Sequence, residues 1–262
     1  MRILVCIKQV PDTNEVKLDK KTGTLIRDGV PSIINPDDKN ALEEALTIKD
    51  NRKDVHVTVI TMGPPQADDA LREALAMGAD DAILLTDRAF GGSDTWSTSL
   101  ILSEAIKKLG TFDIIFCGRQ AIDGDTAQVG PQIAEKLNIP QITYVKKLEI
   151  QGDEVVAERA LEDGYQVIRT KMPCLLTAIK ELNQPRYASV PGIVEAYDEK
   201  EVKIMTYDDL KIDKALIGLE GSPTNVKKTF TPEQKGQGRR LEGSVVEMCS
   251  ELVSELKGKL IL

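Results

Sequence analysis

The chain has 262 residues, of which 34 are Lys or Arg and 42 are Asp or Glu, so its formal net charge is −8. This length suits one large domain or one domain with an extension, and it buries enough surface to need no disulfide or metal for stability. The acidic balance disfavours binding to nucleic acid or to an anionic membrane, because both need a basic face. An aromatic content of 4% argues against a stacking platform for single-stranded nucleic acid.

The cysteines and the one histidine do not form a metal-binding pattern. There is no Cys-x-x-Cys pair, and the four cysteines are widely scattered, at Cys6, Cys117, Cys174 and Cys249. We therefore expect no zinc or iron–sulfur site. His56 stands alone within a strand pattern, and we expect it to be a packed core residue. Because no apolar run reaches the ~18 residues of a membrane span and no signal peptide is visible, we expect a cytoplasmic protein that does not insert into membranes.

The first two-thirds of the chain alternates short apolar runs with amphipathic segments. Strands are predicted over residues 3–7, 55–62, 82–85, 112–117 and 142–145, with a hairpin-like excursion over 16–26. Helices are predicted after Asn35, which acts as the N-cap of Pro36, and then over residues 67–77, 96–109 and 131–137. This order predicts an α/β fold with a parallel, doubly wound, Rossmann-like sheet of the adenine-nucleotide-binding kind.

The pattern changes in the last third of the chain. Strand-like segments over residues 147–170 are separated by Gly-Asp and Asp-Gly turns, so antiparallel strands extend the sheet, and residues 173–179 form one more strand. Residues 218–243 hold too few apolar residues to fold alone, and an amphipathic helix follows over 244–257. We therefore expect a nucleotide-binding α/β domain over residues 1–217, and over 218–262 an extended arm whose C-terminal helix packs on a partner subunit.

A glycine-containing loop after the strand at 112–117 is the most informative segment for function. It leads into a helix whose first turn contains Pro131, with Gly130 as the expected N-cap. Backbone N–H groups at a helix start favour a phosphate, and the loop adds hydroxyl, amide and guanidinium groups. An ordinary loop with a capping aspartate remains the alternative, since its carboxylates repel phosphate. The candidate nucleotide-binding residues of this loop are Gly118, Arg119, Asp123, Gly124, Asp125, Thr126, Ala127, Gln128 and Val129.

Other strand ends are expected to meet this loop at the same edge of the sheet. Cys6 and Met62 would give apolar contact to an adenosine, while Asn35, Asp37 and Asp38 would give polar contact at a helix start. No serine–histidine pair, paired carboxylate or metal cluster forms a catalytic constellation. The absence of catalytic residues favours a cofactor carrier or a binding protein over a hydrolase.

Several motifs together resemble the β subunit of electron transfer flavoproteins. They are the loop at 118–131, the opening strand ILVCIKQV at 3–10, the stretch ALAMGAD at 74–80 and NQPRYASVP at 183–191. The resemblance covers essentially the whole chain. It implies a heterodimer with a flavoprotein α subunit and a partner-recognition loop at 183–191, with Arg186, Tyr187, Val190 and Pro191 as partner-binding residues.

The segment at 23–37 resembles the electron-bifurcating group of that family. In this group the β subunit holds a second FAD that receives hydride from NADH, so the protein supplies no acid or base and the chemistry is that of the cofactor. One electron goes to an acyl-CoA dehydrogenase or related flavoprotein and the other to ferredoxin or flavodoxin. Two alternatives stay open: an ordinary β subunit holding structural AMP, and a stand-alone nucleotide-binding regulator of the stress-protein type.

Overall fold

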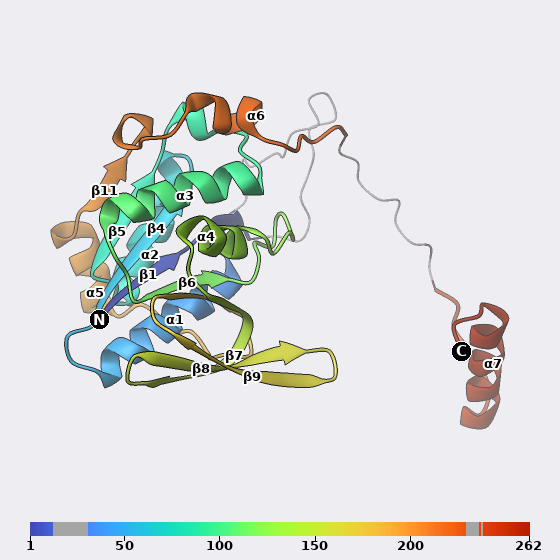
Figure 1. Cartoon of the computed structure of the whole chain (residues 1–262). Coiled ribbons are helices and arrows are strands. Elements are labelled where there is room, and N and C mark those ends of the chain that lie inside the picture. The colour runs from blue at the N-terminus through green and yellow to red at the C-terminus, as the bar shows by residue number, and fades with distance from the viewer. Residues whose placement is uncertain (13–30, 229–235, 237) are drawn as a thin grey trace. The chain divides into compact units, whose positions relative to one another are not determined.

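A mixed β-sheet organises the protein, as shown by a computed structural model that describes residues 1–12, 31–228, 236 and 238–262 (Figure 1). Within these residues nine strands pair in the order β11-β5-β4-β1-β6-β10-β7-β8-β9. Neighbours from β11 to β7 are parallel, and β8 and β9 are antiparallel. The strands are β1 (Arg2–Cys6), β4 (His56–Met62), β5 (Asp81–Leu85), β6 (Ile114–Gly118), β7 (Gln141–Gln151), β8 (Glu154–Leu161), β9 (Gly164–Lys171), β10 (Cys174–Ala178) and β11 (Val202–Met205).

Helices cover both faces of this sheet, which confirms the predicted fold class. On one face, α1 (Pro36–Asn51) and α2 (Asp68–Met77) bury their apolar residues, and on the other α3 (Thr95–Leu109) and α4 (Val129–Leu137) do the same. Because each face is covered, the central strands are apolar on both sides. Smaller elements are β2 (Gln9–Pro11) and β3 (Ser32–Ile34), which pair with each other, α5 (Val190–Val194), a π-helical turn (Glu195–Glu199) and α6 (Gly218–Gly221).

The chain reverses its winding direction between β1 and β6. From β1 it passes through α1 to β4 and through α2 to β5, moving toward one edge of the sheet. After α3 it returns to β6, on the other side of β1. Such a switch point leaves a crevice outside the carboxyl ends of the two central strands, which is where open α/β sheets bind ligands.

Three features of the sheet differ from the sequence-based expectation. Residues 142–145 and 147–150 belong to one strand, β7, whose register shifts at a bulge where Tyr144 adopts a positive φ of 57°. The strand at 173–179 inserts as β10 between β6 and β7. The short edge strand β11 was not expected, because only four residues form it. The predicted excursion at 16–26 lies outside the described residues.

His56 is exposed, so the prediction that it packs in the core is wrong. It is the first residue of β4, where the strand emerges at the amino edge of the sheet, and its side chain is 48% exposed. Its Nε2 lies 2.9 Å from Oδ2 of Asp81. The apolar residues of β4 begin one position later, at Val57.

The C-terminal helix forms as predicted. It is α7 (Val245–Gly258), which begins in a capping box: the Ser244 hydroxyl accepts from the Glu247 N–H, and the Glu247 carboxylate accepts from the Ser244 N–H. Arg239 forms ion pairs with Glu251 and Glu255 of the helix. No described residue of α7 is buried within the chain.

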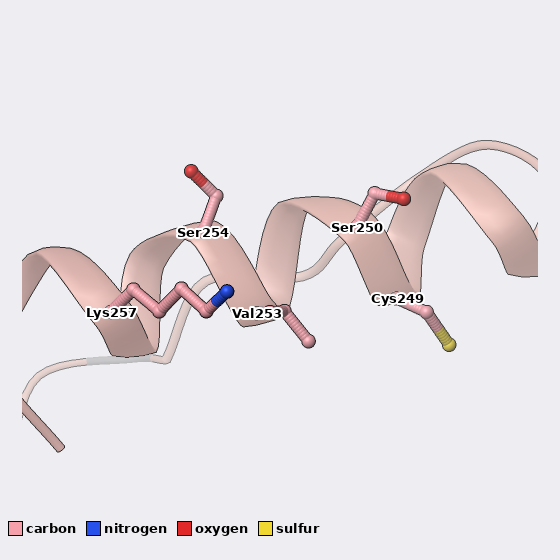
Figure 2. Close-up of a pocket in the computed structure, with 5 residues that line it drawn as sticks. All are labelled: Cys249, Ser250, Val253, Ser254 and Lys257. Atoms are coloured by element: carbon pink, nitrogen blue, oxygen red, sulfur yellow. The ribbon is translucent and has the colours of Figure 1, made fainter. Parts of the chain in front are cut away.

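A hollow lies on the surface of α7. Figure 2 shows the side chains that border it, Cys249, Ser250, Val253, Ser254 and Lys257. All the described residues that line it come from this single helix. The described residues from 228 onward belong to a different compact unit from the α/β sheet. None of the described helices combines the length and the apolar composition needed to cross a membrane.

Substitution of Gly118 tests how closely β6 approaches the first turn of α1. A Cβ there would lie 2.2 Å from Oδ1 of Asp38 and 2.6 Å from its backbone nitrogen, whereas at Gly124 it would meet nothing within 4 Å. We expect Gly118→Ala to lower the free energy of unfolding by about 2–3 kcal/mol, as overpacking against fixed backbone does, and Gly124→Ala to change it by less than about 0.5 kcal/mol. Urea unfolding measures both, and equal effects would contradict the close approach.

Candidate functional site

A cleft of about 360 Å³ opens at the carboxyl ends of β1, β4 and β6. Its floor is apolar and contains Cys6, Met62, Leu102 and Cys117. Its walls come from the loop between β6 and α4 and from the first residues of α3. The walls include Lys8, Ser93, Asp94, Thr95, Thr98, Arg119, Gln120, Ala121, Gly124, Thr126, Ala127, Gln128, Val129 and Gly130. The topology therefore brings an apolar floor and polar walls together at the switch point.

Asp38 fixes the two central strands at the base of the cleft. Its Oδ2 accepts from the Lys8 backbone N–H at 2.8 Å, and its Oδ1 accepts from the Gly118 N–H at 2.9 Å. The residue is 7% exposed. Burial raises the pKa of the Asp38 carboxyl to about 7, although the two N–H donors favour the ionised form. The first turn of α1 thus holds the ends of β1 and β6 together.

The Asn35 side chain bonds to the loop that follows β6. It occupies the N-cap position of α1, but its side chain makes no capping hydrogen bond. Its Nδ2 donates to the Gln120 carbonyl at 2.8 Å, and its Oδ1 accepts from the Ile122 N–H at 3.0 Å. The Asp125 carboxylate accepts from Nε2 of Gln120 at 2.8 Å. Asn35 therefore shapes the loop that borders the cleft and is not among the residues that line it.

The start of α4 presents unused hydrogen-bond donors. Gln128 is the N-cap and Val129 the first helical residue, so the expectation that Gly130 caps the helix is wrong by two positions. Pro131 still lies in the first turn, where its missing N–H costs nothing. The backbone N–H groups of residues 126–130 donate to no acceptor among the described residues. Asp125 and Ala127 hold positive φ angles of 48° and 52° in this loop, a strained backbone of the kind found at functional sites.

Among the three helices that start at the cleft, α4 is the one suited to an anion. Asp37 and Asp38 lie in the first turn of α1, and the Asp94 carboxylate caps α3 by accepting from the Ser97 N–H at 3.0 Å. These carboxylates offset the positive ends of the α1 and α3 dipoles. The first turn of α4 contains no acidic residue. An anion in the cleft is therefore favoured at α4 and disfavoured at the other two helices.

The two cations beside the cleft are each paired with a carboxylate that sequence analysis placed in the site. Nζ of Lys8 lies 2.7 Å from Oδ1 of Asp123, and Nε of Arg119 lies 3.3 Å from Oδ2 of Asp37. Burial raises the pKa of Asp37, and the charge of Arg119 opposes that shift. Asp123 and Asp125 do not line the cleft, because each is turned toward a partner on the protein. The repulsion between these carboxylates and a phosphate is thereby reduced.

The structure brings most of the predicted cofactor-binding residues into one cleft. Ten of them line it: Cys6, Asp38, Met62, Gly118, Arg119, Gly124, Thr126, Ala127, Gln128 and Val129. The other four lie behind the lining, at Asn35, Asp37, Asp123 and Asp125. Sequence reasoning missed Thr95 and Thr98 at the start of α3, although a helix over 96–109 was predicted there. Oγ1 of Thr95 lies 3.0 Å from Oε1 of Gln128, so this helix start is joined to the cleft loop.

The segment at 183–191 is anchored to α1 and exposes its tip. The Arg186 guanidinium binds Glu43, with Nε 2.9 Å from Oε2, and Asp50, with Nη2 2.7 Å from Oδ2. The bonds to Glu43 raise the pKa of Arg186. Asn183 exchanges hydrogen bonds with Asn40 at 2.8 and 3.0 Å. The Arg186 side chain is therefore committed to the fold and positions the segment.

Three other residues of this segment face outward. Tyr187 is 95% exposed, Val190 is 76% exposed, and Pro191 is also exposed. The helix α5 that follows sits directly on α2, since a Cβ at Gly192 would lie 2.3 Å from the Ala76 carbonyl oxygen. An anchored segment thus presents an apolar tip in a fixed position.

A parallel, doubly wound sheet with a helix start open to an anion at its switch point defines a Rossmann-like nucleotide-binding class. The electron transfer flavoprotein domain family matches residues 22–210 of this chain. The chain is 63% identical to the electron transfer flavoprotein subunit beta of Thermoanaerobacterium thermosaccharolyticum, in a match that covers 100% of both chains. This chain therefore belongs to the electron transfer flavoprotein β-subunit family, which confirms the resemblance seen in its motifs.

The names of two further relatives refer to a caffeyl-CoA reductase and an acryloyl-CoA reductase. A subunit of the caffeyl-CoA reductase-Etf complex of Acetobacterium woodii is 57% identical, and 100% of both chains is covered. The acryloyl-CoA reductase electron transfer subunit gamma of Anaerotignum propionicum is 52% identical, again over 100% of both chains.

The raised pKa of Asp38 predicts a pH-dependent stability. Its folded pKa of about 7 lies above the ordinary value of 3.8, so the folded protein binds the extra proton between these values. The stability from this group is complete below about pH 4 and is lost as pH rises through about 7. Between pH 5 and pH 8 we expect the free energy of unfolding to fall by about 2–3 kcal/mol more in the wild type than in Asp38→Asn. Urea titrations at each pH measure this difference, and parallel slopes would contradict it.

Proposed function

We propose that this chain is the β subunit of a heterodimeric electron transfer flavoprotein of the bifurcating type. Its cleft holds an FAD that accepts hydride from NADH. Electrons then pass to an acyl-CoA dehydrogenase-type flavoprotein and to a low-potential acceptor, ferredoxin or flavodoxin. The observation that carries the nucleotide assignment is the open start of α4 at the switch point, with free N–H groups and no acidic residue in its first turn.

The residues of the cleft fit the adenosine diphosphate portion of the cofactor. The N–H groups of residues 126–130 and the Thr126 hydroxyl are suited to the phosphates. The apolar floor at Cys6 and Met62 is suited to the adenine, and Arg119 adds a cation beside the loop. When bound, the flavin supplies the hydride acceptor. The residues of this chain bind and orient it, and none acts as an acid or a base.

The names of the relatives support the proposed partners. Two of them belong to complexes of acyl-CoA reductases, whose substrates are thioesters of the kind that acyl-CoA dehydrogenases handle. The exposed apolar side chains of α7 fit an interface with the α subunit, because none of its described residues is buried within this chain. Support for the bifurcating subtype comes from the sequence segment at 23–37, of which residues 23–30 lie outside the described structure.

One alternative keeps the same cleft and changes its occupant. In an ordinary β subunit, AMP would fill the cleft as a structural nucleotide, and the cleft volume of about 360 Å³ suits a mononucleotide as well as it suits part of FAD. The stand-alone regulator is disfavoured, since the relatives that match along the whole chain are subunits of electron transfer systems.

Thr126→Glu tests the phosphate site. A carboxylate among the N–H groups at the start of α4 would repel the nucleotide and occupy its place. We expect the purified wild-type heterodimer to release two FAD per heterodimer on denaturation, and the variant to release one. Chromatography of the released nucleotides measures both. Thr126→Ser keeps the hydroxyl and is expected to retain both FAD molecules.

Two results would count against these assignments. Unchanged nucleotide content in Thr126→Glu would contradict the phosphate site at α4. One FAD and one AMP released from the wild-type heterodimer would establish the structural-AMP alternative and remove the bifurcating assignment.

The segment at 183–191 is the proposed docking site for the acyl-CoA dehydrogenase-type partner. Arg186 and Asn183 hold it on α1, while Tyr187, Val190 and Pro191 are available for contact. Small transient interfaces concentrate their binding energy in a few apolar anchors. We assign that role to Val190, because it is exposed at the first position of α5, next to the anchored segment.

Val190→Asp is expected to weaken docking while the fold remains intact, because an acidic residue is favourable in the first turn of a helix. Loss of one apolar contact of about 1–3 kcal/mol predicts a loss of roughly 5- to 150-fold in affinity for the dehydrogenase. We expect NADH still to reduce the flavin in the variant heterodimer, as measured by anaerobic titration. The matched control is Val167→Asp on β9, where the side chain is 64% exposed.

The NADH titration also tests the wild type. If NADH reduces no flavin in the wild-type heterodimer, the bifurcating assignment is wrong. If Val190→Asp abolishes NADH reduction and docking equally, the substitution has damaged the fold. If Val167→Asp weakens docking as much as Val190→Asp does, Val190 is not a docking anchor.

A further inference from the structure

Two cysteine side chains lie next to each other on the floor of the cleft. Cys6 and Cys117 are register partners on the neighbouring parallel strands β1 and β6, so both side chains point to the same face of the sheet. Both line the cleft, and both are free thiols. Of the other cysteines, Cys174 lies on β10 away from the cleft lining and Cys249 lies on α7.

The spacing of the strands suits a bond between the two thiols. Neighbouring strands are about 4.8 Å apart, and disulfides join Cα atoms about 4.4–6.8 Å apart. Contact with the Cys6 thiol and burial raise the pKa of the Cys117 thiol well above its ordinary value. Both effects keep Cys117 protonated near neutral pH, so the pair stays reduced unless an oxidant reaches the cleft.

The thiol pair also touches the proposed phosphate site. A Cβ at Gly130 would lie 3.4 Å from Cβ and 3.6 Å from Sγ of Cys117, so the backbone of the first turn of α4 rests on this side chain. A change at Cys117 therefore acts directly on the helix start whose N–H groups face the cleft.

We propose that Cys6 and Cys117 form an oxidisable dithiol that closes to a disulfide with a two-electron oxidant of the peroxide class, and that a nucleotide seated in the cleft shields it. The shielding part rests on the proposed function, because a nucleotide over the apolar floor covers both sulfur atoms. By linkage, closure of the disulfide then weakens nucleotide binding to the same degree that nucleotide binding opposes closure.

The reaction balances without any further reagent. One thiolate attacks a peroxide oxygen, the O–O bond breaks, and a sulfenic acid and water form. The second sulfur attacks the sulfenic sulfur and displaces a second water. Two thiols lose two protons and two electrons, and the peroxide is reduced to two molecules of water. Because the thiolate is the attacking species, closure is expected to be faster at pH 9 than at pH 7.

The test uses the purified heterodimer, stripped of nucleotide by gel filtration in mild denaturant and then returned to buffer with or without FAD. Each sample is treated with hydrogen peroxide at pH 8, alkylated, digested without reductant and analysed by mass spectrometry. We expect a linked pair of peptides containing Cys6 and Cys117 in the stripped protein. We expect its formation to be at least tenfold slower in the refilled protein.

Internal controls come from the same chain. Cys174 is expected to stay reduced and to be alkylated once the protein is unfolded, because it lies on β10 and does not line the cleft, and Cys249 is expected to oxidise in every sample, because it is exposed. Cys117→Ser and Cys6→Ser are each expected to remove the linked pair and leave the remaining thiol to reach a sulfenic or sulfinic acid.

Three outcomes decide the proposal. Absence of the linked pair in stripped protein, while Cys249 oxidises, overturns the dithiol. Equal rates of closure in stripped and refilled protein, with the FAD content verified, overturn the shielding. If the heterodimer takes up no nucleotide at all, the proposed function fails, and formation of the linked pair in that protein still supports the dithiol on its own.

Discussion

The two hydrogen bonds that Asp38 accepts are the contacts on which the rest of this site depends. They join the end of β1 to the end of β6 through the first turn of α1, at the point where the sheet reverses its winding. Gly118 makes this possible, because any side chain there would collide with Asp38. With these strand ends fixed, the loop that follows β6 leaves the sheet in a defined direction and begins α4 at the mouth of the cleft.

The same helix connects the cleft with the proposed docking segment. Asp38 lies in the first turn of α1, and two and five residues later Asn40 and Glu43 hold Asn183 and Arg186. A helix of 16 residues that packs along the sheet is a rigid element. The position of the segment at 183–191 relative to the cleft is therefore set by helical geometry.

The sequence predicts the α/β architecture well because buried strands and amphipathic helices leave local periodic patterns. It also identifies the loop at 118–129, where glycine and polar residues separate a buried strand from a helix. It does not predict contacts between distant residues. The hydrogen bond between Asp38 and Gly118 joins positions 80 residues apart. The sequence alone also does not show that Arg186 pairs with Glu43. The place of His56 was missed because an apolar strand pattern does not show where the strand leaves the sheet.

In a chain with a net charge of −8, the proposed phosphate site depends on the dipole of a helix start. Lys8 and Arg119 are paired with Asp123 and Asp37, so these ion pairs add little net charge around the cleft. What remains is the unneutralised start of α4 and a loop strained at Asp125 and Ala127. The positive φ angles cost stability in the free protein. Backbone geometry is therefore what sets the position of an anion at the proposed phosphate site.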